Sequence, residues 1–61
     1  MTVSLAKAMC DGGLAMGYAE VRRYIDSGVV QVNGKLARSW NQLVYVGDVI
    51  KLGSYRSCVV K

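Results

Sequence analysis

One change of hydrophobic period, at Gly28, constrains the fold of this 61-residue chain more than any other feature. Before it, apolar side chains recur at the three- and four-residue spacing of a helix, at Val21, Tyr24 and Ile25. After it, Val30 and Val32 alternate with a polar residue, which is the spacing of a half-buried strand. Gly28 itself suits the left-handed position that follows a last helical turn. The sequence therefore predicts a helix from about Tyr18 to Ser27 that leads directly into a strand.

The same helical spacing occurs near the start of the chain. It predicts a short helix from about Ser4 to Asp11, with a buried stripe formed by Leu5, Ala8, Met9 and Gly12. Thr2 or Ser4 could cap the start of this helix by accepting a backbone N–H, and the sequence does not choose between them. Because Gly12-Gly13 ends the helix, the two helices are joined by a short loop.

A hairpin follows the second helix. Asn33-Gly34 is the preferred pair for a two-residue type I′ turn, because both positions tolerate positive φ. A strict hairpin of this kind places Leu36 opposite Gln31, on the face away from the two valines. Either that face is also covered, or the hairpin opens early.

The rest of the chain has the pattern of further strands. Residues 43–46 and 49–52 predict a second strand pair about a tight turn, and residues 55–60 predict a last strand. The polar segment 38–42 between them is expected to be a loop, and it carries the only tryptophan. The predicted fold class is α+β, a helix-loop-helix packed on a small twisted antiparallel sheet, as a single domain over residues 1–61.

Composition favours a noncatalytic domain with an anionic partner. Eight basic and four acidic residues give a formal net charge of +4, which favours polyanions such as nucleic acid, although many soluble domains carry such a charge for solubility alone. With no histidine and four carboxylates that suit ion pairs, a helix end and a turn, we expect no catalytic residues, no enzyme activity and no cofactor.

The cysteines and the apolar segments indicate in which cellular compartment the protein is expected to lie. Cys10 and Cys58 lie near opposite ends of a chain without histidine, which argues against a metal site. They form either a disulfide or, more simply, two buried thiols in a reducing compartment. No apolar run approaches the roughly 18 residues of a membrane span, and the first residues do not have the pattern of a secretory signal. We expect no membrane partner and a cytoplasmic location.

The second predicted helix carries candidate RNA contacts. Tyr18 and Arg22 share one exposed stripe at i, i+4, and Arg23 lies on its neighbouring edge. The alternative is that both arginines are solvated and paired with the carboxylates of Asp26 and Glu20.

Other candidates lie outside this helix. Lys7 is in the first turn of its helix, where a cation opposes the helix dipole and where free backbone N–H groups could meet a phosphate. Lys35 beside the hairpin turn and Arg38 in the next loop are either phosphate contacts or ordinary solvated cations. Trp40, like Tyr18, could stack on a base, or it could close the bottom of a small core.

The order of loop, paired-arginine helix, strand and Asn-Gly turn resembles the RNA-binding domain named after small-subunit ribosomal protein S-four. The resemblance runs from about Leu5 to about Leu52. Its motifs are Gly-Leu-Ala at 13–15, Glu-x-Arg-Arg-x-Ile at 20–25, Gly-x-Val-x-Val-Asn-Gly at 28–34 and Gly-Asp-x-Ile at 47–50. It implies the alpha-L motif, a helix-loop-helix followed by a strand, which grips structured RNA through basic residues, here Arg22, Arg23, Lys35 and Lys7.

The last residues of the chain resemble one particular group of proteins that carry this domain. Residues 50–61 look like the closing strand pair of bacterial tyrosyl-tRNA synthetases, which carry this domain at the carboxyl terminus and use it to hold tRNA. That resemblance implies a role in translation. A parent enzyme with its own catalytic domain and a free-standing relative are both compatible with the sequence.

We therefore expect a monomeric, noncatalytic module that binds tRNA or ribosomal RNA. Its predicted contact residues are Lys7, Tyr18, Arg22, Arg23, Lys35 and Arg38. Two alternatives stay open. The first is a protein-interaction module on the same scaffold. The second is the accessory domain of an RNA-modifying enzyme such as a pseudouridine synthase, which would need a catalytic domain beyond these residues.

Overall fold

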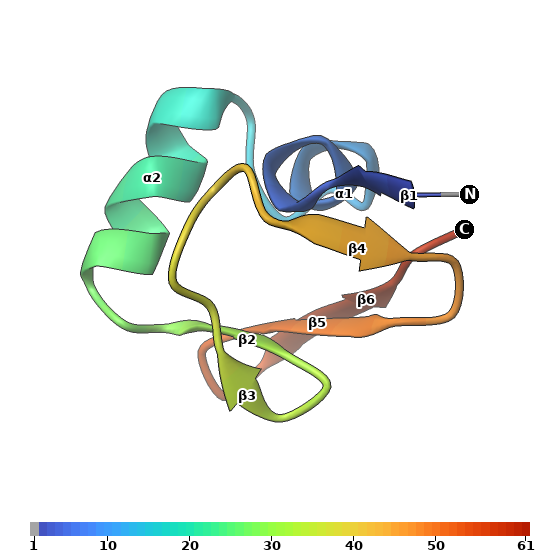
Figure 1. The fold of residues 1–61 in the computed structure, drawn as a ribbon. Helices are drawn as coiled ribbons and strands as arrows, with labels where there is room; N and C mark the ends of the chain where they lie inside the picture. The colour runs from blue at the N-terminus through green and yellow to red at the C-terminus, as the bar shows by residue number, and fades with distance from the viewer. Residues whose placement is uncertain (1) are drawn as a thin grey trace.

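The computed structural model describes residues 2–61 and has the α+β class that the sequence predicts (Figure 1). In chain order the elements are β1 (Thr2–Ser4), α1 (Leu5–Asp11), α2 (Tyr18–Asp26), β2 (Val30–Val32), β3 (Lys35–Leu36), β4 (Leu43–Tyr45), β5 (Val49–Leu52) and β6 (Arg56–Val59). Figure 1 shows the two helices at the top of the molecule and β2, β3, β5 and β6 at the bottom, with β4 between them. Neither helix has the length or the apolar character that crossing a membrane requires.

The strands form two antiparallel sheets, not the single sheet that the sequence predicted. One sheet contains β1 and β4, and the other has the order β3-β2-β5-β6. The predicted pairing of β4 with β5 is wrong, because β2 and β6 occupy both edges of β5. β4 pairs instead with β1, which places Val3 opposite Val44. β1 has only three residues, too few for the period-two pattern to be recognised in the sequence.

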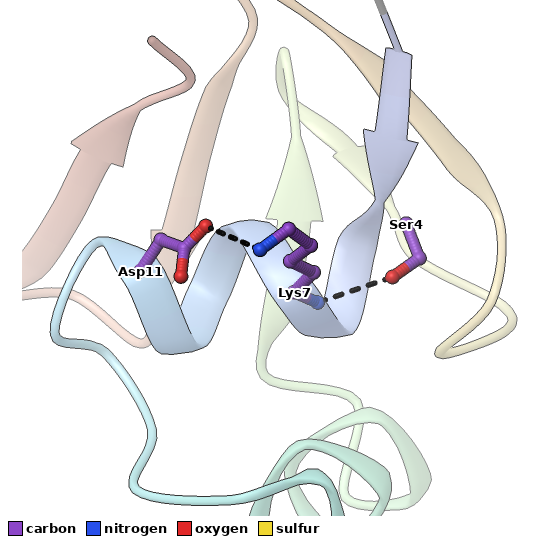
Figure 2. A network of polar contacts seen from close by, with 3 residues as sticks. All are labelled: Ser4, Lys7 and Asp11. Carbon is purple, nitrogen blue, oxygen red and sulfur yellow. Dashed lines mark hydrogen bonds and ion pairs between the residues drawn. The ribbon is translucent and has the colours of Figure 1, made fainter.

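The structure decides between the two candidate caps of α1. Ser4 precedes the helix in an extended conformation, and its hydroxyl accepts the Lys7 backbone N–H at 3.2 Å (Figure 2). The helix ends at Gly12, as predicted, and the Gly12 N–H donates to the Ala8 carbonyl at 2.9 Å. A Cβ on Gly12 would lie 2.6 Å from the Cys58 sulfur, so only glycine lets the end of α1 approach β6 this closely.

α2 begins without a side-chain cap at Gly17. Glu20, in its first turn, instead holds the chain that enters the helix, because its carboxylate accepts the Met16 backbone N–H at 3.2 Å and the Tyr24 hydroxyl at 3.3 Å; its negative charge also suits the start of the helix dipole. The helix ends at Asp26, within a residue of the prediction, and Gly28 has the expected positive φ of 76°.

The core draws on both helices and both sheets. Its largest fully buried side chains are Leu5, Met9, Val21, Val30, Val44 and Ile50. Each buried side chain of this kind contributes roughly 1.5–3 kcal/mol. Trp40 is not part of this core and keeps 37% of its surface exposed. Cys10 and Cys58 are free, half-buried thiols packed against the core, which agrees with the two-thiol alternative.

The hairpin between β2 and β3 opens early. Asn33 and Gly34 have φ values of 53° and 84°, as a type I′ turn requires, and Gln31 lies opposite Leu36, as predicted. Leu36 is 57% exposed and its partner Gln31 is also exposed, so this face of the sheet is largely open to solvent. β3 ends at this residue, and the chain turns away as buried Ala37 donates its N–H to the Val30 carbonyl at 2.8 Å.

Candidate nucleic-acid interface

The segment after β3 lies beside α2 (Figure 1). This brings two aromatic rings together, because the ring centroids of Tyr18 on α2 and Trp40 in the loop are 5.9 Å apart, with their planes tilted by 42°. Trp40 was expected either to stack on a base or to close the core. In the structure it lies at the surface, paired with another exposed aromatic ring.

The first turn of α1 holds this loop in place. The Leu5 N–H donates to the Gln42 carbonyl at 2.8 Å, and the Ala6 N–H donates to the Trp40 carbonyl at 2.9 Å. Helix-terminal N–H groups lack partners within the helix, and here the loop supplies them. The expectation that this helix start offers free N–H groups to a phosphate is therefore wrong. A further bond, from the Arg38 N–H to the Gln42 side-chain carbonyl at 3.2 Å, closes the loop on itself.

A hollow of about 170 Å³ lies between α2 and the loop, which we call the arginine hollow. It is lined by Arg22, Ile25, Asp26, Arg38, Ser39 and Trp40. The three helical residues are spaced i, i+3, i+4 and so lie on one face of α2. The fold thus brings the predicted contacts Arg22 and Arg38 to one place, with the half-buried side chain of Ile25 as an apolar part of the wall.

A second hollow, of about 490 Å³, adjoins the hairpin. It is lined by Val32, Asn33, Lys35, Leu36, Arg38 and Gln42. Arg38 lines both hollows, so it links the predicted contact Lys35 to the arginine hollow. Three of the predicted cations, from three separate segments, therefore line two hollows that share Arg38.

The arginines of α2 do not form the ion pairs considered from the sequence. Among residues 2–61, the one ion pair within 4.0 Å joins Lys7 and Asp11, at 3.3 Å. Glu20 is committed to the start of α2, and Asp26 lines the arginine hollow. The ion-pair part of the alternative is therefore not found among the described residues, whereas the exposure of Arg22 and Arg23 agrees with its other part, that both arginines are solvated.

Two predicted contacts lie apart from this arrangement. The Lys7 ammonium group is directed toward Asp11 along α1 (Figure 2). Arg23 is exposed on α2, and neither it nor Lys7 lines either hollow. Lys7 thus has a local partner in an exposed ion pair along α1.

Sequence reasoning missed part of the site. Asp26 and Ser39 were not among the predicted contacts, yet both line the arginine hollow. The i+4 spacing from Arg22 to Asp26 was a usable signal, since it places both on one helical face. Arg56, in contrast, is used within the fold, because its guanidinium donates to the Gly13 carbonyl at 2.6 Å and so ties β6 to the loop between the helices.

The chain was also compared with known proteins. Family models, curated protein sequences and solved structures gave no significant match. The function of the domain is therefore inferred from the geometry and chemistry of the site and from the sequence motifs.

Proposed function

We propose that this domain is a noncatalytic RNA-binding module whose main contact surface consists of Tyr18, Arg22, Arg38 and Trp40, the α2–loop surface. The observation that supports this most is that Arg22 and Arg38 line one hollow beside an exposed aromatic pair. Lys35 extends the surface along the second hollow. A positively charged surface next to aromatic rings is the combination that RNA recognition uses.

The chemistry of each group supports the proposal. A guanidinium binds a phosphate through two parallel N–H bonds, and no ion pair within the described chain has to be broken first. Tyr18 and Trp40 are both exposed enough to meet a base, and a stacked base contributes about 1–3 kcal/mol. The net charge of +4 favours encounter with any polyanion.

We further propose that α1, α2 and β2 form the alpha-L motif of S-four-type domains, with tRNA or ribosomal RNA as the partner. The order of helix, loop, helix, strand and hairpin supports this, together with the motifs at 20–25 and 28–34. A role in translation in the cytoplasm, in a tyrosyl-tRNA synthetase or as a free-standing module, follows from the same proposal.

The experiment is a titration of labelled tRNA at two salt concentrations. The test variant is Arg22→Ala with Arg38→Ala, and the matched control is Lys51→Ala with Lys61→Ala. The control removes the same charge from two exposed residues, and neither residue lines the arginine hollow or the second hollow beside the hairpin. We expect binding to the unmodified domain that weakens with salt, a loss of roughly tenfold or more in the test variant and a much smaller loss in the control.

Two outcomes would count against the proposal. Equal losses in the test and control variants would mean that net charge alone attracts RNA, without a defined surface. Absence of binding even at low salt would reject RNA as the partner. Arg23→Ala should have less effect than Arg22→Ala, because Arg23 lines neither hollow.

Protein binding is the second candidate function, favoured by one observation. Leu43, Tyr45 and Val46, on and just after β4, are 61%, 58% and 60% exposed. Neighbouring exposed apolar side chains of this kind are a mark of protein interfaces. Binding that tolerates salt and is lost in Leu43→Ser with Tyr45→Ser, but not in the double arginine variant, would favour this function.

A further inference from the structure

The arginine hollow contains a carboxylate that phosphate binding does not explain. Asp26 lines it together with Arg22 and Arg38, and its carboxylate forms no ion pair among residues 2–61. A negative charge in this place weakens the attraction of a bare phosphate. A ligand that fits the whole hollow therefore needs hydrogen-bond donors for Asp26 as well as a negative group for the arginines.

The shape of the hollow suggests what such a ligand is. It holds about 170 Å³, with Ile25 on the α2 side and Trp40 on the loop side. That space suits one flat heterocycle and is too small for a folded stretch of RNA. Trp40, which is 37% exposed, contributes to the wall an aromatic side chain of the kind on which bases stack. A single unpaired nucleotide meets these requirements, with its base in the hollow and its phosphate at an arginine.

The carboxylate selects among the bases. A carboxylate such as that of Asp26 only accepts hydrogen bonds, through its two oxygens. Guanine presents two adjacent donors, N1–H and the N2 amino group, on its Watson–Crick edge. Adenine and cytosine present one amino group beside an acceptor nitrogen, and uracil presents one N–H between two carbonyls. Guanine is thus the base whose edge matches the two carboxylate oxygens without placing an acceptor against them.

We propose that the arginine hollow binds an unpaired guanine of the RNA, with Trp40 stacked on the base and Asp26 accepting from N1–H and N2. Arg22 and Arg38 then hold the adjoining phosphate. This inference rests on the proposed RNA-binding function and adds to it a preference for one base at one position.

The test uses a set of RNA hairpins with identical stems and one variable loop position flanked by uridines. The variable nucleotide is G, inosine, A, C or U. We expect the G hairpin to bind the intact domain roughly tenfold or more tightly than the A, C and U hairpins. The inosine hairpin should bind with intermediate affinity, because inosine keeps N1–H and lacks the N2 amino group.

The variant Asp26→Asn examines the role of the carboxylate, with Asp11→Asn as the matched control on the other helix. In Asp26→Asn the preference for G should disappear while the U hairpin binds at least as well as before, because a repulsive charge is lost. Asp11→Asn should keep the preference. Thermal unfolding of both variants checks that the fold is intact, and the comparison of hairpins on the intact domain does not depend on any variant.

The failures of the two proposals are distinguishable. Equal, salt-sensitive binding of all five hairpins would overturn the guanine preference and leave RNA binding standing. If Asp26→Asn bound every hairpin more strongly by the same factor, Asp26 would only repel RNA and would not select a base. That result would also overturn the inference. Absence of binding of any hairpin at low salt would reject RNA binding itself, and the guanine site with it.

Discussion

The side chain of Asn33 bonds to that of Asp48 across two separate turns. The Asn33 amide donates to the Asp48 carboxylate at 3.1 Å, and the Tyr45 backbone N–H donates to its other oxygen at 2.9 Å. The side-chain carbonyl of Asn33 in turn accepts the Val49 backbone N–H at 2.9 Å. These bonds join the β2–β3 turn, beside Lys35, to the turn that ends β4. The backbone N–H of Tyr45 and then the amide of Asn33 lower the pKa of the Asp48 carboxyl.

This lowered pKa predicts a contribution to acid stability. A carboxyl whose pKa is lower in the folded state stabilises the fold above its unfolded pKa of about 3.9, and the contribution is lost as pH falls through the folded value. Asp48→Asn should therefore be less stable than the unmodified domain at pH 7, and the difference should shrink below about pH 4. Urea unfolding of both proteins at pH 7 and pH 3 measures it. A difference independent of pH would contradict the assignment.

The contact between Tyr18 and Trp40 predicts an optical signal. Tyr18→Ala removes one ring of the pair, so Trp40 should become more exposed and its fluorescence emission should shift to longer wavelength. The free energy of unfolding should fall by about 0.5–1.5 kcal/mol. Tyr55→Ala is the matched control, because Tyr55 is almost completely exposed. An unchanged emission maximum in Tyr18→Ala would mean that the rings do not shield each other in solution.

The close approach of Gly12 to Cys58 predicts a coupled pair of substitutions. Gly12→Ala should destabilise the fold by about 1–3 kcal/mol, since its new Cβ would meet the Cys58 sulfur. Gly17→Ala provides the control for an added Cβ, because a Cβ there meets nothing within 4 Å and the backbone is extended, so only the cost of replacing a helix-capping glycine is expected. Adding Cys58→Ala should recover part of the loss, as measured in a double-mutant cycle. Strictly additive effects would show that the two residues are not in contact.

The salt dependence of RNA binding measures how many phosphates the basic residues of the domain neutralise. Each phosphate neutralised contributes about −0.7 to −0.9 to the slope of log affinity against log salt concentration. If Arg22 and Arg38 each neutralise one phosphate, their double alanine variant should have a slope shallower by about 1.4 to 1.8, and by about half of that if they share one phosphate. Titrations at four or five salt concentrations give both slopes. Parallel lines for the two proteins would place the phosphate contacts elsewhere.

Local chemistry made much of the fold predictable. The positive-φ pair Asn33-Gly34 set the hairpin, and Gly28 set the end of α2, because each turn requires a backbone angle that few residues adopt. The pairing of β4 was not predictable in the same way. It depends on which strand edges are left free once β2 and β6 have paired with β5, and that is decided by the whole sheet.

The candidate site also contains a part that local sequence predicts and a part that only the folded chain brings together. Tyr18, Arg22 and Asp26 are connected by helical spacing, so the sequence contained their shared face, although Asp26 was considered only as an ion-pair partner. The approach of Arg38 and Trp40 to that face has no local signal. It results from backbone bonds between the loop and the start of α1, which only the folded chain creates.

Those bonds make the loop a cap for a helix to which it is not adjacent in sequence. Because the carbonyls of Trp40 and Gln42 satisfy the first amides of α1, releasing the loop would leave that helix with unpaired donors at its buried end. Amide hydrogen exchange at Leu5 and Ala6 should therefore report on the order of the loop. The backbone of the loop that carries Arg38 and Trp40 is thus anchored to the first turn of α1, and the two should lose their order together.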